Sequence, residues 1–210
     1  MLKSDFYYDL PEELIAQTPL EPRDSSRLMK IDRASGEIVH DHFYNICDYL
    51  KKGDLLVMND SKVFPARLYG IKQGTGAAVQ FLLLHQVSKD RWEVMVKPGK
   101  RLKIGTKVDF GGILTAEIVD YADGGDRIAE FTYDGDNIFE VLDKIGQMPL
   151  PPYITKKLEN KDRYNTIYSN EVGSAAAPTA GLHFTENVFA KLKEKSIQIL
   201  NKKKPFINIY

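Results

Sequence analysis

The chain has 210 residues, and its 29 lysines and arginines are balanced by 29 aspartates and glutamates, so the formal net charge is zero. This balance excludes a globally basic protein, and any nucleic-acid contact must come from a local basic surface. Apolar residues make up 43% of the chain and aromatic residues 10%, which is typical of a folded globular protein of one or two domains.

The sequence gives no sign of a membrane segment, a disulfide or a metal site. No stretch approaches the roughly 18 consecutive apolar residues of a membrane helix, and MLKSDFYYDL carries charges where a signal peptide is apolar. We therefore expect a cytoplasmic monomer that does not contact membranes. Cys47 has no cysteine partner, and the histidines at 40, 42 and 85 lack ligands at metal-binding spacing, so we expect no bound metal.

The first part of the chain predicts helices and strands in alternation. Residues 10–17 (LPEELIAQ) predict a short helix, with a proline suited to the first helical position. Two extended runs within residues 27–43 predict a hairpin, and apolar residues at helical spacing predict a helix over residues 43–50. Residues 54–60 (DLLVMND) form a continuous apolar run and predict a fully buried strand.

The pattern changes after residue 65 to six short β-type runs separated by glycine-rich turns, which close most simply as a barrel. Helical spacing returns at residues 137–145, and further on Thr185 precedes another helix and IQIL a strand. We therefore predict a small antiparallel β-barrel domain at residues 65–147. It is inserted into a discontinuous and incomplete α/β main domain formed by residues 1–64 and 148–210.

The segment AAAPTAGLHF, residues 175–184, combines small residues with one threonine and one histidine just before a predicted helix. Small side chains let a ligand approach the backbone, and a helix N-terminus offers free N–H donors. Thr179 adds a hydroxyl, and His183 a group that titrates near neutrality. One interpretation is a substrate-binding loop, and the other is a tightly packed loop with a hydrogen-bonded histidine.

Two polar stretches are further candidates for binding residues. Asn59, Asp60 and Arg67 follow the predicted strand, where α/β proteins bind ligands, and Asp60 could accept ribose hydroxyls. The alternative for this stretch is an Asx-type turn. In EPRDSSR, Arg23 could grip a carboxylate or phosphate, and the alternative is a solvated loop with local ion pairs.

Charge is unevenly distributed within the predicted barrel. Residues 89–107 hold seven basic and two acidic residues, whereas residues 108–143 hold one basic and ten acidic residues. The basic half could contact RNA phosphates. Alternatively, it is a solvated hairpin that pairs with the acidic half. The candidate RNA-contacting residues are Lys97, Lys100, Arg101 and Lys103.

Several long motifs in the same order resemble the S-adenosylmethionine:tRNA ribosyltransferase-isomerase family, over residues 1 to about 199. The motifs are DFYYDLPEELIAQTPLEPRDSSRL, GDLLVMNDSKVFPARL, VKPGKRLKIG, MPLPPYI and SAAAPTAGLHFTE. The resemblance implies transfer of the ribosyl group of S-adenosylmethionine to 7-aminomethyl-7-deazaguanine in tRNA. Isomerisation then gives epoxyqueuosine tRNA, and adenine and methionine are released. S-adenosylmethionine is thus the expected co-substrate and tRNA the expected partner, with no cofactor.

The resemblance also implies a chemistry for the candidate residues. The sulfonium acidifies the adjacent ribose carbon, so a base that removes this proton starts the reaction. We expect His183 and Asp60 to be catalytic, with His183 transferring the proton. The expected substrate contacts are Asp60 and Asn59 to the ribose, Arg23 and Arg67 to anionic groups, and Thr179 and Gly181 near the backbone.

The end of the chain departs from the family pattern. After SIQIL the family continues with a strand and a glycine-rich LHVGLGTF segment, whereas this chain continues with NKKKPFINIY. We expect a C-terminal truncation that makes the activity of this chain doubtful. The alternatives are a non-catalytic tRNA-binding remnant and an unfolded product, which a non-cooperative thermal melt would reveal.

Overall fold

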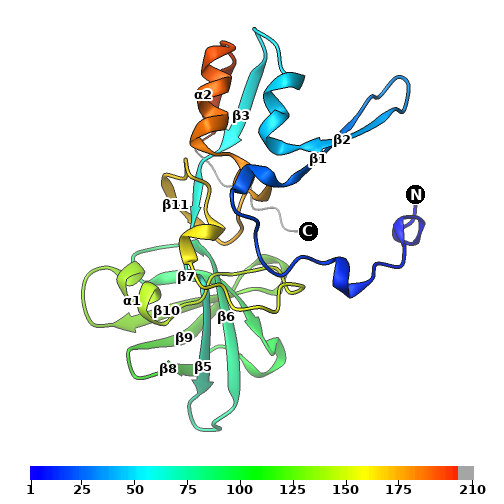
Figure 1. Ribbon diagram of the computed structural model, residues 1–210. Coiled ribbons are helices and arrows are strands. Elements are labelled where there is room, and N and C mark those ends of the chain that lie inside the picture. The colour runs from blue at the N-terminus through cyan, green and yellow to red at the C-terminus, as the bar shows by residue number, and fades with distance from the viewer. Residues whose placement is uncertain (203–210) are drawn as a thin grey trace.

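The computed structural model describes residues 1–202, which include a closed six-stranded barrel at one end of the molecule (Figure 1). Neighbouring strands are antiparallel, in the order β10-β7-β6-β5-β8-β9, and β9 pairs with β10 to close the ring. The predicted small antiparallel barrel is therefore confirmed. The strands are β5 (Arg67–Lys72), β6 (Ala78–Gln86), β7 (Arg91–Lys97), β8 (Lys107–Phe110), β9 (Leu114–Tyr121) and β10 (Arg127–Tyr133).

The barrel interior is filled by alternate side chains of its strands, as period-two burial requires. Phe81, Leu83 and Val94 are fully buried in this first core. The predicted helix is present as α1 (Ile138–Ile145), which begins with the Asn137 side chain accepting a hydrogen bond from a backbone N–H of its first turn. Its apolar face packs on the same core.

A second core lies outside the barrel and includes Phe43, Cys47, Phe184 and Val188. Around it lie the hairpin of β1 (Arg27–Ile31) and β2 (Ile38–His42) and the helix α2 (Glu186–Glu194) (Figure 1). Two parallel strand pairs complete this part: β3 (Leu55–Asn59) with β12 (Gln198–Lys202), and β4 (Ser61–Val63) with β11 (Glu171–Ser174). The structure thus confirms the predicted hairpin, the predicted helix after Thr185 and the predicted strand at IQIL.

Three predictions about the first 60 residues need correction. LPEELIAQ forms only one 3-10 turn, η2 (Glu12–Leu14), because its side chains contact no core that would stabilise a short helix. Residues 43–50 form a 3-10 helix, η4 (Phe43–Tyr49), that buries Phe43 and Cys47. The strand β3 is not fully buried: within residues 1–202 it pairs with β12 alone, and Leu55 is 51% and Val57 61% exposed.

Short 3-10 helices connect the remaining elements. They are η1 (Lys3–Phe6), η3 (Arg23–Ser25), η5 (Gly99–Arg101), η6 (Asp123–Gly125), η7 (Lys161–Tyr164) and η8 (Thr179–His183). No helix within residues 1–202 has both the length and the apolar character needed to cross a membrane. The domain boundaries at residues 65 and 147 stay a prediction. Of the expected departure NKKKPFINIY, Asn201 and Lys202 end β12, and residues 203–210 lie outside the described residues.

Candidate functional site

The segment around His183 connects the two cores. Ala175, at its start, packs into the barrel core, whereas Phe184, at its end, packs into the second core. Between them, Thr179 to His183 form the helix η8, and Thr185 then caps α2 by accepting a hydrogen bond from the N–H of Val188. Close packing at the start of the segment thus involves Ala175, whereas Ala176 and Thr179 are exposed.

Tyr168 links this segment to the exit of β3. Its hydroxyl lies against Gly181, where an added Cβ atom would be only 2.1 Å away, and its ring packs edge-on against Phe184 and Phe189. Burial raises the pKa of Tyr168, and the nearby negative charge of Asp60 raises it further. Tyr168 thus packs against Gly181 and is close enough to Asp60 for its pKa to respond to that charge, although 121 positions separate Asp60 and Gly181 in the sequence.

Asp60 is buried, with only 4% of its surface exposed, and its Oδ1 atom has no hydrogen-bond partner within the described residues. A buried carboxylate oxygen without a donor is costly, and such an atom is available to a ligand. The neighbouring Asn59 accepts a hydrogen bond from the N–H of Ser61 at 2.9 Å. The Asx-type turn considered for this stretch is therefore present at Asn59.

Arg23 is held by the segment that precedes β11. Its Nη1 atom donates to the carbonyl of Asn165 at 2.6 Å, and its Nη2 atom donates to the carbonyl of Asp162 at 3.4 Å. Burial lowers the pKa of Arg23, and the positive charge of Arg163 adds to this effect. Part of the guanidinium donor capacity is thus used within the protein.

His183 is half-buried, and its ring lies 5.2 Å from that of Phe43, centre to centre. Burial lowers the pKa of His183, the charge of Arg163 lowers it further, and the backbone of Arg23 opposes the shift. The lowered pKa favours the neutral imidazole, which is the form that can accept a proton. The same contacts place His183 beside Arg23.

Arg67 adjoins the other end of the segment. Its Nη2 atom donates to the carbonyl of Leu150 at 3.2 Å, while its buried Nε has no partner within the described residues. Burial raises the pKa of Tyr164, Tyr153 adds to this shift, and the backbone of Ala177 and the charge of Arg67 oppose it, so Tyr164 interacts with both of these residues. The structure thus places His183 beside Arg23 and Gly181 against Tyr168, the residue whose pKa the charge of Asp60 raises. Arg67 contacts the backbone of Leu150.

The residues between η7 and β11 that pack beside this region were not predicted from the sequence. The Asn165 side chain accepts from the N–H of Val63 at 2.7 Å and donates to its carbonyl at 3.0 Å, so it pairs with β4 as a strand would. Thr166 is buried and contacts Tyr168. The signal that could have revealed these residues is the concentration of Asn, Thr and Tyr in RYNTIYSN.

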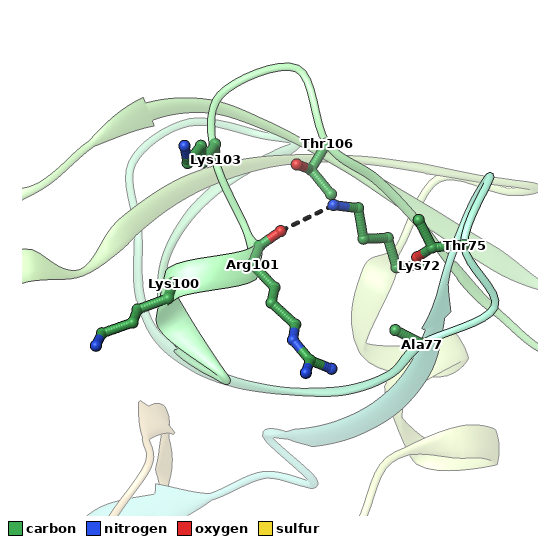
Figure 2. A pocket seen from close by; sticks show the side chains of 7 residues that line it. All are labelled: Lys72, Thr75, Ala77, Lys100, Arg101, Lys103 and Thr106. Carbon is green, nitrogen blue, oxygen red and sulfur yellow. Dashed lines mark hydrogen bonds between the residues drawn. The ribbon is translucent and has the colours of Figure 1, made fainter.

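A second candidate site is an open basic hollow on the barrel, with a volume of about 660 Å³. Figure 2 shows Lys72, Thr75 and Ala77 on one side and the segment from Lys100 to Thr106 on the other. Three of the four predicted RNA-contacting residues line this hollow, namely Lys100, Arg101 and Lys103. Lys97 does not line it and lies exposed at the end of β7, whereas Lys72 was not predicted.

Among residues 1–202, no three His, Cys, Asp or Glu side chains gather as ligands for a metal ion. The candidate site offers an imidazole with a lowered pKa, a carboxylate oxygen without a partner among the described residues, a hydroxyl and guanidinium groups. These groups can accept a proton and hold the hydroxyl and anionic groups of a polar substrate.

Comparison with known proteins decides the family. Residues 3–201 match the model of a family described as queuosine biosynthesis protein. The chain belongs to the queuosine biosynthesis protein family. The resemblance to this family found in the five motifs is therefore confirmed.

Two relatives in the queuosine biosynthesis protein family are named S-adenosylmethionine:tRNA ribosyltransferase-isomerase. The protein of Caldanaerobacter subterraneus subsp. tengcongensis is 58% identical over 200 residues, which cover 94% of this chain and 58% of the relative. The protein of Thermoanaerobacter sp. (strain X514) is 56% identical with the same coverage. The chain thus spans about three-fifths of the length of these relatives.

A solved structure also matches the chain. The S-adenosylmethionine tRNA ribosyltransferase of Thermotoga maritima is 35% identical, and the match covers 94% of this chain and 56% of the other, with a TM-score of 0.38.

Proposed function

We propose that this chain catalyses the reaction for which its relatives are named, with S-adenosylmethionine as ribosyl donor and a tRNA as acceptor. The acceptor is the 7-aminomethyl-7-deazaguanine base of the tRNA, and the product is epoxyqueuosine tRNA, with release of adenine and methionine. The observation that carries the proposal is the family match over residues 3–201, together with relatives that are 58% and 56% identical.

His183 is the base in this proposal. The positive sulfur of S-adenosylmethionine acidifies the neighbouring ribose carbon, and a neutral imidazole can take the proton from it. Burial lowers the pKa of His183 and so favours the neutral, proton-accepting imidazole. Loss of this proton starts ring opening, after which adenine leaves and the amine of the tRNA base is admitted.

The other groups bind and orient the substrate. The Oδ1 atom of Asp60, which is buried and has no hydrogen-bond partner among residues 1–202, is suited to accept a hydrogen bond from a ribose hydroxyl. Thr179 offers an exposed hydroxyl in the same helix as His183, and the lack of a side chain at Gly181 lets Tyr168 approach. The free Nε of Arg67 remains available for an anionic group of the substrate.

Adenine release from S-adenosylmethionine, measured with tRNA that carries the aminomethyl base, tests the proposal. We expect His183→Gln to lower the rate by about 10² or more, the usual contribution of a general base. His85→Gln is the matched control, since His85 is exposed on the barrel. Full turnover by the folded His183→Gln variant would show that His183 is not the base.

The pH dependence of the same assay gives a second readout for His183. Because the base must be neutral and its pKa is lowered, the acidic limb of the wild-type pH–rate profile should have its midpoint below 6.5, the ordinary histidine value. A midpoint at or above 6.5 would contradict the assignment.

A second candidate function is tRNA binding without catalysis. The basic hollow on the barrel favours it, because its lining residues are distinct from the His183 segment and need no catalytic group. Binding of tRNA without adenine release would support this function, whereas both together would support the enzyme.

A further inference from the structure

The basic hollow is built by two loops that meet at one end of the barrel. Lys72 ends β5 and Thr75 follows in the turn to β6, whereas Lys100, Arg101 and Lys103 belong to the connection between β7 and β8. The Lys72 ammonium donates to the carbonyl of Arg101 at 2.9 Å, as Figure 2 shows. A backbone hydrogen bond of 2.9 Å from Gln73 to Lys107 joins the same two loops. The four cations therefore lie around two loops that hydrogen bonds join to each other.

The cations of the hollow differ from the other basic residues of the barrel in their partners. Lys89, Arg91 and Lys107 each form an ion pair with an acidic residue of the barrel's second half or of the loop that follows β10. In the part of the chain that the structure describes, none of the four hollow cations takes part in an ion pair. The predicted pairing of the basic and acidic halves thus holds for the strands but leaves a group of like charges around the hollow.

The composition of the lining indicates the class of ligand. Besides the four cations, it consists of Thr75, Thr106 and Ala77, so it offers charge and hydroxyl groups but no aromatic ring on which a base could stack. Lysine, arginine and threonine side chains are the groups that contact phosphate and sugar without reading sequence. A hollow of about 660 Å³ that opens to solvent suits one stretch of a long polymer better than a small molecule, which binds in an enclosed pocket.

We propose that this hollow binds the phosphodiester backbone of RNA, at a site separate from the His183 segment and independent of base sequence. The identification of the polyanion as RNA rests on the proposed function. Lys97 lies outside this site. Lys72 contributes a cation and also holds the backbone of Arg101 by its hydrogen bond.

RNA binding measured without S-adenosylmethionine tests the inference apart from catalysis. The probes are an unmodified tRNA transcript and an RNA duplex of unrelated sequence. Lys100→Gln/Lys103→Gln should weaken binding of both by about tenfold at physiological salt. It should also reduce the slope of log affinity against log salt by about 2, because each neutralised phosphate contributes about 0.9.

The matched control is Lys51→Gln/Lys52→Gln, which removes the same charge from an exposed turn outside the barrel. This control and Lys97→Gln should leave the salt slope nearly unchanged. Equal losses in the control and in the hollow variant would overturn the inference, as would an unchanged slope in the hollow variant. Displacement of RNA by micromolar inorganic phosphate would also overturn it, since that result indicates a small-anion site.

Two further readouts separate possible failures. Both substituted lysines are exposed, so the variant should melt at the wild-type temperature; if it melts lower, Arg101→Gln provides the same test with one charge. If RNA binding depends on the hollow but no adenine is released, the proposed catalysis fails while this inference stands. If adenine is released and the hollow variants bind RNA normally, only the inference fails.

Discussion

Gly181 shows how one missing side chain can position a candidate site. The hydroxyl of Tyr168 occupies the space that a Cβ atom at position 181 would need, at 2.1 Å, and a Thr166 methyl group lies 2.9 Å from the same point. The Tyr168 ring packs edge-on against both Phe184 and Phe189, which stack on each other. This close packing brings the helix of His183 against Tyr168, whose pKa the charge of Asp60 also raises.

We predict that Gly181→Ala destabilises the protein by about 1–3 kcal/mol, the usual cost of overpacking. Tyr168→Phe removes the clashing oxygen and should recover part of this loss in the double variant. Gly146→Ala is the control, because its added Cβ would meet the backbone oxygens of Pro65 and Leu142 instead. Urea unfolding measures the stability of all these variants. If Tyr168→Phe restores as much stability to Gly146→Ala as to Gly181→Ala, the prediction is contradicted.

At the scale of elements, α2 depends on a residue that has two partners. The Thr185 hydroxyl accepts from the N–H of Val188 at 3.3 Å and donates to the buried carboxylate of Asp24 at 2.7 Å. One hydroxyl thus caps the helix and ties its start to η3, the element that also carries Arg23. The start of α2 and the position of Arg23 are therefore fixed together.

We predict that Thr185→Ala lowers the free energy of unfolding by about 1–3 kcal/mol, because it removes a helix cap and a hydrogen bond to a buried carboxylate. Thr185→Ser keeps the hydroxyl and should lose less than half as much. The midpoint of urea unfolding measures both variants. A serine variant as unstable as the alanine variant would mean that the threonine methyl group, and not the hydroxyl, stabilises this region.

At the scale of the whole molecule, stability should be concentrated in the barrel. Its closed ring pairs every strand on both edges, whereas β1–β2 and β3–β12 are isolated pairs within the described residues. We predict that the backbone amides paired between β6 and β7 exchange with solvent most slowly, and that those of β1 and β2 exchange much faster. Hydrogen exchange followed by mass spectrometry measures this order, and equal protection of the hairpin would contradict it.

The elements that the sequence predicts correctly are those whose signal is local. Alternating residues between glycine-rich turns predict the barrel, and apolar spacing with a preceding Asn or Thr predicts α1 and α2. The exposure of β3 could not be predicted in this way, because an apolar run does not state how many neighbours the strand has.

The site shows the same division between local and distant information. Its histidine and aspartate could be selected from their own segments, but the contacts that join them could not. Asn165 pairs with Val63 across 102 positions, and Tyr168 reaches both Asp60 and Gly181 from a segment with no marked periodicity. Such contacts depend on the tertiary fold, and a single sequence does not reveal them.

The segment that carries His183 is anchored at both ends, by Ala175 in one core and by Phe184 in the other. A ligand bound to this segment therefore contacts a link between the two cores. If one core rotates relative to the other, the His183 ring changes its orientation as well.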